Sequence, residues 1–323
     1  MTKAIRVHAT GGPEVLSYED VEVGAPGPGQ ARVRHKAIGV NFIDVYFRTG
    51  AYPAPLPFVP GNEGAGIVEA VGEGVTDVAP GDRVAYAAGL GAYADVRLIE
   101  ADRLVKLPAG IDDETAAAMM LKGLTAQYLL RRTYRVEPGD TILVHAAAGG
   151  VGLILCQWGK HLGATVIGTV GSAEKGELAR ANGADHVIDY TREDFAARVA
   201  EITNGEKCAV VYDGVGRATF PASLDCLRPL GMFVSFGSAS GPVDAFDIGL
   251  LAKKGSLFAT RPTLFTYIAK RADLVASAHD LFAVVESGAV TIPVHARAPL
   301  SEVADVHRRL EGRATTGATV LLP

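Results

Sequence analysis

The chain has 323 residues, a formal net charge of −5 at pH 7 and a pI near 5.9. Hydrophobic residues make up 48% and charged residues 21%, which is globular composition and excludes an intrinsically disordered chain. The acidic balance, without a Lys/Arg block, argues against general nucleic-acid binding. No uncharged apolar run reaches the roughly eighteen residues of a membrane span, so no membrane association is expected.

The first third of the chain has the pattern of short β-strands. Apolar segments such as AIRVHA (4–9), GAGIVEAVG (64–72) and DRVAYA (82–87) are separated by turns rich in Gly, Pro and Asp. This spacing predicts a small barrel or sandwich rather than parallel βα units.

After Glu114 the pattern changes to alternating helices and strands. Helical spacing predicts helices over 219–231 and 266–288, among others. Six strands are predicted, at 141–146, 165–170, 186–190, 209–216, 232–237 and 256–261. Strands that alternate with helices indicate an open, doubly wound parallel sheet, so the fold class is α/β.

A glycine-rich turn, HAAAGGVG (145–152), joins the first of these strands to a helix. Gly149 and Gly152 occupy the second and third glycine positions of a dinucleotide fingerprint, and Ala147 replaces the first. Gly149 is therefore predicted to let the backbone approach the cofactor pyrophosphate, which meets free N–H groups at the positive end of the helix. A tight strand-to-helix turn without a ligand is the alternative.

The end of the second strand favours NADPH over NADH. Enzymes that use NAD place an Asp or Glu there to bind the ribose diol, whereas this chain has GTVGSAEKG. Gly171, Ser172 and Lys175, with Tyr190 from the next strand, suit a 2′-phosphate better. The alternative for Lys175 is a solvated helix residue.

Several motifs occur in a family-specific order: KAIGVNFIDVY, GNEGAGIVEAVGEGV, LKGLTAQYLLR, HAAAGGVGLILCQWGK, VYDGVG and TRPTL. In this combination the chain resembles the zinc-free, NADPH-dependent quinone oxidoreductases of the medium-chain dehydrogenase/reductase superfamily. The resemblance implies a GroES-like β-barrel catalytic domain, residues 1–122 and 264–323, and a Rossmann cofactor domain, residues 123–263. It also implies a homodimer.

The resemblance carries over further cofactor contacts, residue by residue. These are Asn41, Phe42, Tyr46, Tyr128, Gly150 and Val151 of the pyrophosphate turn, Val215, Phe236, Gly237, Ser238, Pro262, Thr263, Leu264 and Arg313.

The zinc-dependent branches of this superfamily bind the metal through an early Cys and a His in a GHE turn. Here Asn41 and Asn62 occupy those two places, and asparagine amides are poor zinc ligands, so no metal is expected. Glu63, next to Asn62, is instead predicted to form a buried hydrogen bond or ion pair, with Arg83 as its partner.

The predicted catalytic residues are Asn41, Tyr46 and Tyr52, in the segment NFIDVYFRTGAY. The tyrosines can stack on a flat ring and donate hydrogen bonds to a developing oxyanion. A core position for Tyr46 and a simple loop position for Tyr52 are the alternatives, and Asp44 is expected only to position the loop.

The expected activity is metal-free reduction of a quinone by NADPH, with an enoyl or 2-alkenal C=C reductase as the enzymatic alternative. A crystallin-like structural protein or an RNA-binding protein is the non-enzymatic alternative. Three separated cysteines without a CxxC motif indicate a cytoplasmic location.

Overall fold

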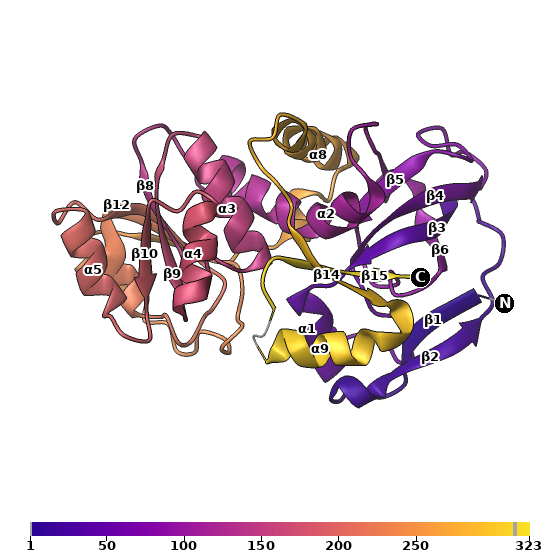
Figure 1. Cartoon of the computed structure of the whole chain (residues 1–323), viewed down its shortest axis with the longest axis horizontal. Helices are drawn as coiled ribbons and strands as arrows, with labels where there is room; N and C mark the ends of the chain where they lie inside the picture. The colour runs from indigo at the N-terminus through magenta and orange to yellow at the C-terminus, as the bar shows by residue number, and fades with distance from the viewer. Residues whose placement is uncertain (1, 313–314) are drawn as a thin grey trace. The chain divides into compact units, whose positions relative to one another are not determined.

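The computed structural model describes residues 2–312 and 315–323, which form two compact units. The N-terminal unit consists of Met1–Leu124, Ile268–Glu286 and Ile292–Pro323, and the central unit consists of Thr125–Tyr267 and Ser287–Thr291. Figure 1 shows the course of the chain through both units. Within the described residues, no helix has the length and apolar character needed to cross a membrane.

The N-terminal unit is built on a seven-stranded sheet, which confirms the β-rich, GroES-like prediction for this part of the chain. Six strands follow the order β14-β15-β3-β4-β5-β7, β6 also pairs with β3, and β1 and β2 form a separate hairpin. The strands are β1 (Thr2–Val7), β2 (Leu16–Val21), β3 (Gln30–Gly39), β4 (Glu63–Val71), β5 (Arg83–Ala87), β6 (Val96–Glu100), β7 (Val105–Lys106), β14 (Val294–Pro299) and β15 (Ala318–Leu322). The α-helices are α1 (Phe42–Thr49), α8 (Arg271–Glu286), α9 (Val303–Glu311) and most of α2 (Asp113–Tyr128).

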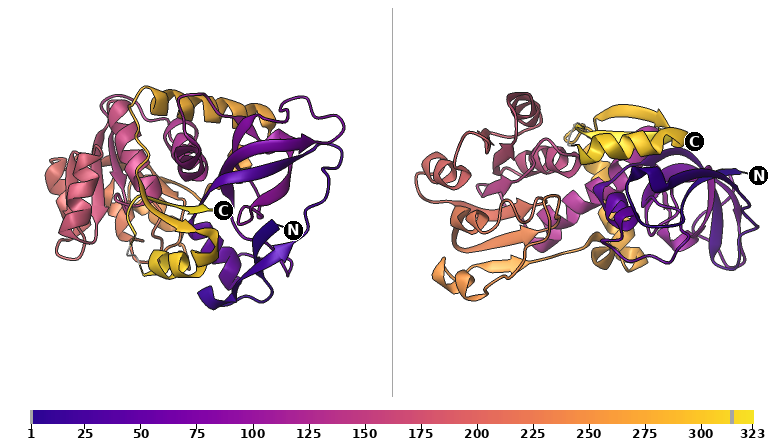
Figure 2. Two further views of the ribbon diagram at one scale, coloured as in Figure 1. Left: turned by 45° about the vertical axis from the view of Figure 1, so that its right-hand side comes forward. Right: turned by 90° about the horizontal axis from the view of Figure 1, so that it is seen from below.

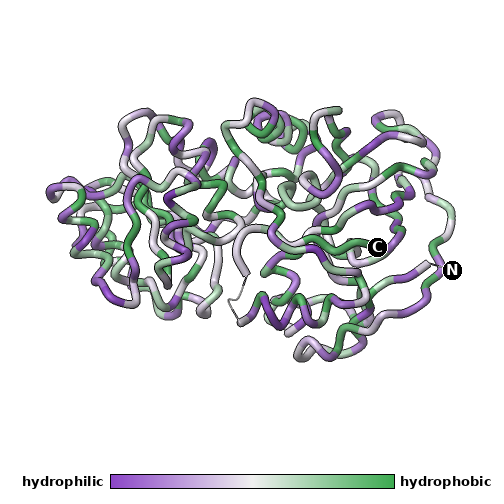
Figure 3. The backbone as a smooth tube through the Cα atoms, in the orientation of Figure 1, coloured by the Kyte–Doolittle hydropathy of each residue, from purple (hydrophilic) through white to green (hydrophobic). Residues whose placement is uncertain are grey.

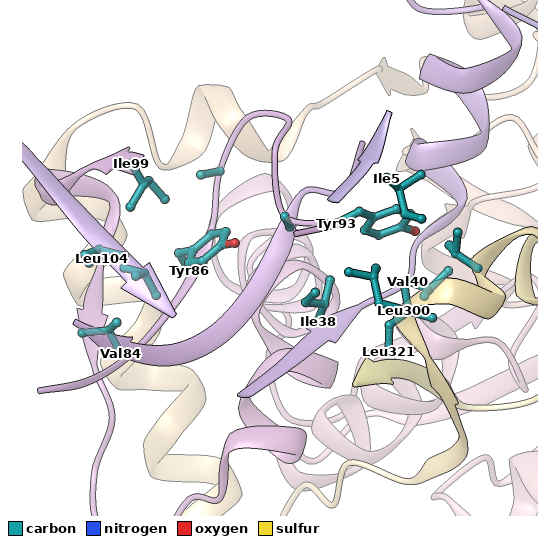
Figure 4. Close-up of a cluster of buried hydrophobic side chains, with 14 of the residues drawn as sticks. Ile5, Ile38, Val40, Val84, Tyr86, Tyr93, Ile99, Leu104, Leu300 and Leu321 are labelled. Carbon is teal, nitrogen blue, oxygen red and sulfur yellow. The ribbon is translucent and has the colours of Figure 1, made fainter. Parts of the chain in front are cut away.

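The core of the N-terminal unit joins the two ends of the sequence. Ile5 and Ile38 share one buried cluster with Leu300 and Leu321 (Figure 4). Figure 2 shows α9 and β15, in yellow, beside the indigo N-terminal strands. In Figure 3 the C-terminal strand is green, whereas α9 alternates between purple and green, as expected for a helix with one face on the core. The C-terminal segment is therefore part of the first unit's core.

The central unit is a six-stranded sheet in the order β10-β9-β8-β11-β12-β13, and every neighbouring pair is parallel. The first strand along the chain lies in the middle, as in doubly wound dinucleotide-binding folds. The strands are β8 (Thr141–Val144), β9 (Thr165–Val170), β10 (His186–Asp189), β11 (Cys208–Asp213), β12 (Leu227–Ser235) and β13 (Phe258–Thr260). The α-helices are α3 (Gly150–His161), α4 (Ala173–Ala181), α5 (Phe195–Ile202), α6 (Gly249–Lys253) and α7 (Leu264–Tyr267). All six predicted strands are confirmed.

Two local predictions are wrong, and the single helix predicted over 266–288 is divided in two, because α7 ends at Tyr267 and α8 begins at Arg271. The helix predicted over 219–231 is wrong, because only a 3₁₀ turn, Ala222–Cys226, forms before β12 begins at Leu227. Pro229 removes a backbone donor, and Leu230 has a φ of 63°, so a helix cannot continue through this segment. The second difference is α1, which occupies a segment without a predicted helix.

Candidate active site

Apart from Tyr128 in α2 and Lys175 in α4, the predicted cofactor residues of the central unit follow the carboxyl ends of its parallel strands. Because parallel strands end at the same edge of a sheet, these segments converge on one edge, where doubly wound folds bind their ligands. In strand order the segments are Tyr190 after β10, Gly171 and Ser172 after β9, Gly149–Val151 after β8, Val215 after β11, Phe236–Ser238 after β12, and Pro262–Leu264 after β13.

The turn from β8 into α3 leaves backbone N–H groups available for an anion. Gly149 is the N-cap of α3 and provides no side-chain cap, so the first-turn N–H groups have no partner from within the helix. A Cβ on Gly152 would lie 2.3 Å from the Ala146 carbonyl oxygen, which explains why glycine is needed there. Ala147 is accommodated because Gly168 lies opposite, where a Cβ would come 2.7 Å from the Ala147 methyl. The turn therefore fits a pyrophosphate despite the loss of the first glycine.

Polar side chains gather at the end of β9, where the 2′-phosphate is predicted to bind. Ser172 caps α4, and its hydroxyl accepts a hydrogen bond from the Lys175 N–H at 3.3 Å. Tyr190 is close by, since a Cβ on Gly171 would lie 2.6 Å from the Tyr190 hydroxyl. The sequence analysis missed Arg192, whose side chain is 79% exposed and lies 3.8 Å from Asp189 in the adjacent loop. No carboxylate ends β9, so this edge suits a phosphate better than a ribose diol.

Asp213, at the end of β11, organises two of the predicted cofactor segments. Its fully buried carboxylate accepts hydrogen bonds from the N–H groups of Val215, at 2.7 Å, and Gly216, at 2.9 Å. Its carbonyl oxygen accepts from the N–H of Phe236 at 2.8 Å. One aspartate thus fixes the turn after β11 to the turn after β12.

Tyr128 is the remaining predicted cofactor residue of the central unit. Its ring stacks on that of Tyr267 at 4.4 Å between centroids, with only 14° between the planes. Burial raises the pKa of the Tyr128 hydroxyl, so the side chain stays neutral at physiological pH. Tyr128 is therefore a fixed, uncharged aromatic surface at the end of α2.

In the N-terminal unit, α1 brings the predicted aromatic residues together. Phe42 and Tyr46 have ring centroids 5.3 Å apart, and the Tyr46 and Tyr52 rings lie 5.1 Å apart. All three side chains are half-buried, so the alternative in which Tyr46 belongs to the hydrophobic core is wrong. Asn41 is the N-cap residue that starts the helix and is 5% exposed. The structure therefore places Phe42, Tyr46 and Tyr52 in one aromatic cluster, and Asn41 at the start of the helix that carries Phe42 and Tyr46.

A buried polar network, which the sequence analysis only partly anticipated, anchors α1. Asp44 accepts hydrogen bonds from the Asn41 N–H at 2.9 Å and from the Tyr93 hydroxyl at 2.8 Å. The Tyr93 hydroxyl also lies 3.1 Å from His307 Nε2, and Arg48 donates to His307 Nδ1 at 3.3 Å. Asp44 therefore positions the helix, as expected, but it does so through residues far away in the sequence.

Comparison with known proteins supports the two-domain fold and the cofactor site over the whole chain. Residues 27–109 match the alcohol dehydrogenase GroES-like domain, and residues 150–275 match the zinc-binding dehydrogenase domain. A quinone oxidoreductase of Pseudomonas aeruginosa is 56% identical over 325 residues, with 100% of both chains covered. The Escherichia coli quinone oxidoreductase, crystallised in complex with NADPH, has a TM-score of 0.97 at 49% identity, covering 99% of this chain and 100% of that one.

This chain belongs to the quinone oxidoreductase family of the medium-chain dehydrogenases/reductases. The family also includes a 2-haloacrylate reductase of a Burkholderia species, which is 48% identical over 335 residues and covers 100% of this chain and 99% of its own.

One predicted contact of this quinone oxidoreductase is wrong, and one predicted site residue lies outside the part of the chain that the structure describes. The expected Glu63–Arg83 pair is wrong: Arg83 donates to Asp113 at 2.8 Å instead. The β4–β5 register explains this, because Glu63 lies opposite Ala87 and Arg83 lies opposite Ile67. Arg313, predicted to return to the cofactor, lies outside the described residues.

The side chains of Asn41 and Asn62, at the places where zinc-dependent members of the superfamily have metal ligands, do not suit a zinc ion. The Asn41 amide donates to Glu63 at 2.7 Å, and the Asn62 amide donates to the Ala88 carbonyl at 3.0 Å. Zinc prefers imidazole and thiolate ligands. Across residues 2–312 and 315–323, no three His, Cys, Asp or Glu side chains gather as a metal site would require.

The α1 network predicts a pH dependence of stability. Burial and the nearby Arg48 lower the pKa of His307 to about 3, whereas an unfolded histidine titrates near 6.5. Between these values the unfolded state binds more protons, so this histidine's contribution to stability is lost as the pH falls from 6.5 to 3. Burial raises the pKa of Asp44 to about 7, which opposes this trend above pH 4. His307→Gln should lower the slope of unfolding free energy against pH, making it more negative by up to about 1.4 kcal/mol per pH unit between pH 4 and 6.5.

Urea denaturation of the wild type and the variant at several pH values between 4 and 6.5 measures the two slopes. His8→Gln is the matched control, because His8 is an exposed histidine of the same unit. An unchanged slope in His307→Gln would contradict the assignment.

Proposed function

We propose that this chain catalyses the two-electron reduction of a quinone-like acceptor by NADPH, without a metal. The observation that carries the proposal is the carboxyl edge of the parallel sheet, where a glycine turn fit for a pyrophosphate adjoins a cluster fit for a 2′-phosphate. The NADPH complex of the E. coli relative supports the same cofactor. NADPH, when bound, supplies the hydride.

Some residues of the protein are proposed to bind the cofactor, and others to bind the acceptor and stabilise the charge that develops on it. The first-turn N–H groups of α3 are proposed to bind the pyrophosphate, and Ser172, Lys175 and Tyr190 the 2′-phosphate. Phe42, Tyr46 and Tyr52 are proposed to hold the flat acceptor ring, with the tyrosine hydroxyls donating to the oxyanion that develops on its carbonyl. A quinone needs little electrophilic assistance, because its ring delocalises the charge.

Reduction of an activated C=C bond is the second candidate function. The 2-haloacrylate reductase, 48% identical over nearly its full length, favours it. The same aromatic cluster can hold a conjugated enone, since hydride addition to an enone also develops charge on a carbonyl oxygen.

An acceptor panel separates these two functions. We expect purified protein with NADPH to reduce naphthoquinones and phenanthrenequinone with kcat/KM at least about tenfold above that for enones, 2-haloacrylate and enoyl thioesters, which corresponds to about 1.4 kcal/mol in the barrier. NADPH oxidation at 340 nm and product analysis measure the ratio. Turnover of the C=C substrates alone would transfer the assignment to the second candidate.

The 2′-phosphate assignment predicts a cofactor-specific loss. Ser172→Ala combined with Lys175→Ala should raise the KM for NADPH by about ten- to a hundredfold and leave NADH use nearly unchanged, because charge-assisted hydrogen bonds to the extra phosphate are removed. Arg180→Ala, in the last turn of the same helix, is the matched control. Equal losses with both cofactors would contradict the assignment. Melting temperatures of the wild type and the double variant show how much stability is lost with the Ser172 cap of α4, separately from cofactor binding.

We further propose that the chain acts as a homodimer in the cytoplasm. The edge strand β13 carries Phe258, which is 55% exposed, and the nearby segments expose Leu230, Phe246 and Ile248. Exposed apolar side chains beside an unpaired strand edge suit a second copy of the same sheet. The three cysteines of the central unit are buried and form no disulfide, which suits a reducing compartment.

The dimer is tested by measuring mass in solution. Wild-type protein should behave as twice the 33.7 kDa chain, and the double variant Phe258→Asp with Ile248→Asp should shift to the monomer in light scattering. Leu56→Asp, at an exposed apolar residue of the other unit, is the control. A wild type that is monomeric at micromolar concentration would refute the proposal.

A further inference from the structure

Glu63 begins β4 with a carboxylate that is completely buried and fully hydrogen-bonded. Its Oε1 accepts from the Asn41 amide and from the Lys122 ammonium, each at 2.7 Å, and its Oε2 accepts from the Leu121 N–H at 2.6 Å. A buried carboxylate remains charged only with this kind of compensation. The donors come from the turn before α1 and from α2, so one carboxylate ties three elements of the N-terminal unit together.

The backbone around Glu63 is shaped to receive the carboxylate. A Cβ on Gly39, at the end of β3, would lie 2.2 Å from Glu63 Oε1 and 2.2 Å from the Ala117 carbonyl oxygen of α2. Any larger residue there would push α2 away and separate Lys122 from the carboxylate. The space for the ion pair therefore depends on glycine at this position.

The charge state of Glu63 determines how the Asn41 side chain is oriented. An ionised carboxylate can only accept hydrogen bonds, so Asn41 must direct its NH₂ group, and not its oxygen, toward Glu63. The Asn41 main chain is held at the same time, because its N–H donates to Asp44. The amide oxygen is on the other branch of the side chain, where it takes part in a capping box with the N–H of Asp44 at the start of α1.

We propose that Glu63 is a positioning residue for the reaction and acts through Asn41. Its carboxylate, paired with Lys122, prevents the Asn41 amide from flipping, and the amide oxygen then stays on the Asp44 N–H and fixes the start of the helix that carries Phe42 and Tyr46. This inference rests on the proposed quinone reductase function and on the proposed role of Phe42 and Tyr46 in its site. Glu63→Gln removes the constraint, because glutamine can also donate and so permits the flipped amide.

A double-mutant cycle tests whether Glu63 acts through Asn41. We expect Glu63→Gln to lower kcat with a quinone at least tenfold, with a smaller change in the KM for NADPH. In an Asn41→Ala background the same substitution should change kcat less than twofold, because the group it positions is gone. Equal losses in both backgrounds would overturn the proposal.

Two further variants separate positioning from stability. Glu63→Leu with Lys122→Met replaces the ion pair by apolar groups, which should keep the melting temperature near that of the wild type while kcat stays as low as in Glu63→Gln. Asp113→Asn removes another tie between the sheet and α2, the Arg83–Asp113 pair, and should change kcat less than twofold. Restored activity in the apolar double variant would show that Glu63 is only structural.

A readout without turnover keeps this inference distinct from the proposed function. In ¹⁵N-asparagine-labelled protein, the side-chain amide of Asn41 should exchange slowly with solvent in the wild type and at least tenfold faster in Glu63→Gln. Loss of one signal in Asn41→Ala assigns it among the other asparagines, Asn62, Asn182 and Asn204. A wild type that reduces no quinone would refute the proposed function, whereas unchanged exchange in Glu63→Gln would refute the role of Glu63.

Discussion

The buried Glu63 carboxylate determines where three elements of the N-terminal unit meet. A charge without solvent needs several donors at hydrogen-bond distance, and these donors come from the turn before α1 and from α2. The helix α2 must therefore lie close against the end of β3, which Gly39 permits. Because α1 starts directly after Asn41, the direction of the helix that carries Phe42 and Tyr46 follows from the same constraint.

In the central unit the corresponding constraint is the parallel alignment of the strands. Each crossover returns the chain to the same edge, so residues as far apart as Gly149 and Leu264 are brought to one edge of the sheet. Asp213 then fixes two of the six turns. Its carboxylate accepts from the Val215 N–H in the turn after β11, and its carbonyl oxygen accepts from the Phe236 N–H in the turn after β12.

The sequence predicts those features that depend on local patterns. Strands such as TVIGTV, and the glycine turn that precedes α3, are recognisable because β-branched runs and glycine spacing have direct conformational consequences. The helix α1 was missed because NFIDVYFRT is rich in β-forming residues, and tertiary contacts of Asp44 and Arg48 stabilise it instead. Arg48 pairs with Glu311, 263 residues away, which no spacing rule can reveal. Glu63 could be recognised as buried, but its partner depends on strand register and helix placement.

The hydrogen bonds around Glu63 also explain how its buried negative charge, beside Asn41, is balanced without a metal ion. The ammonium of Lys122 is the positive charge that compensates Glu63, and the asparagines that replace zinc ligands serve as hydrogen-bond donors. An ammonium is a hydrogen-bond donor and not a Lewis acid, so Lys122 does not replace a metal ion that would polarise a substrate carbonyl. Such a site suits acceptors that spread their own developing charge, and quinones and conjugated enones do so where simple ketones do not.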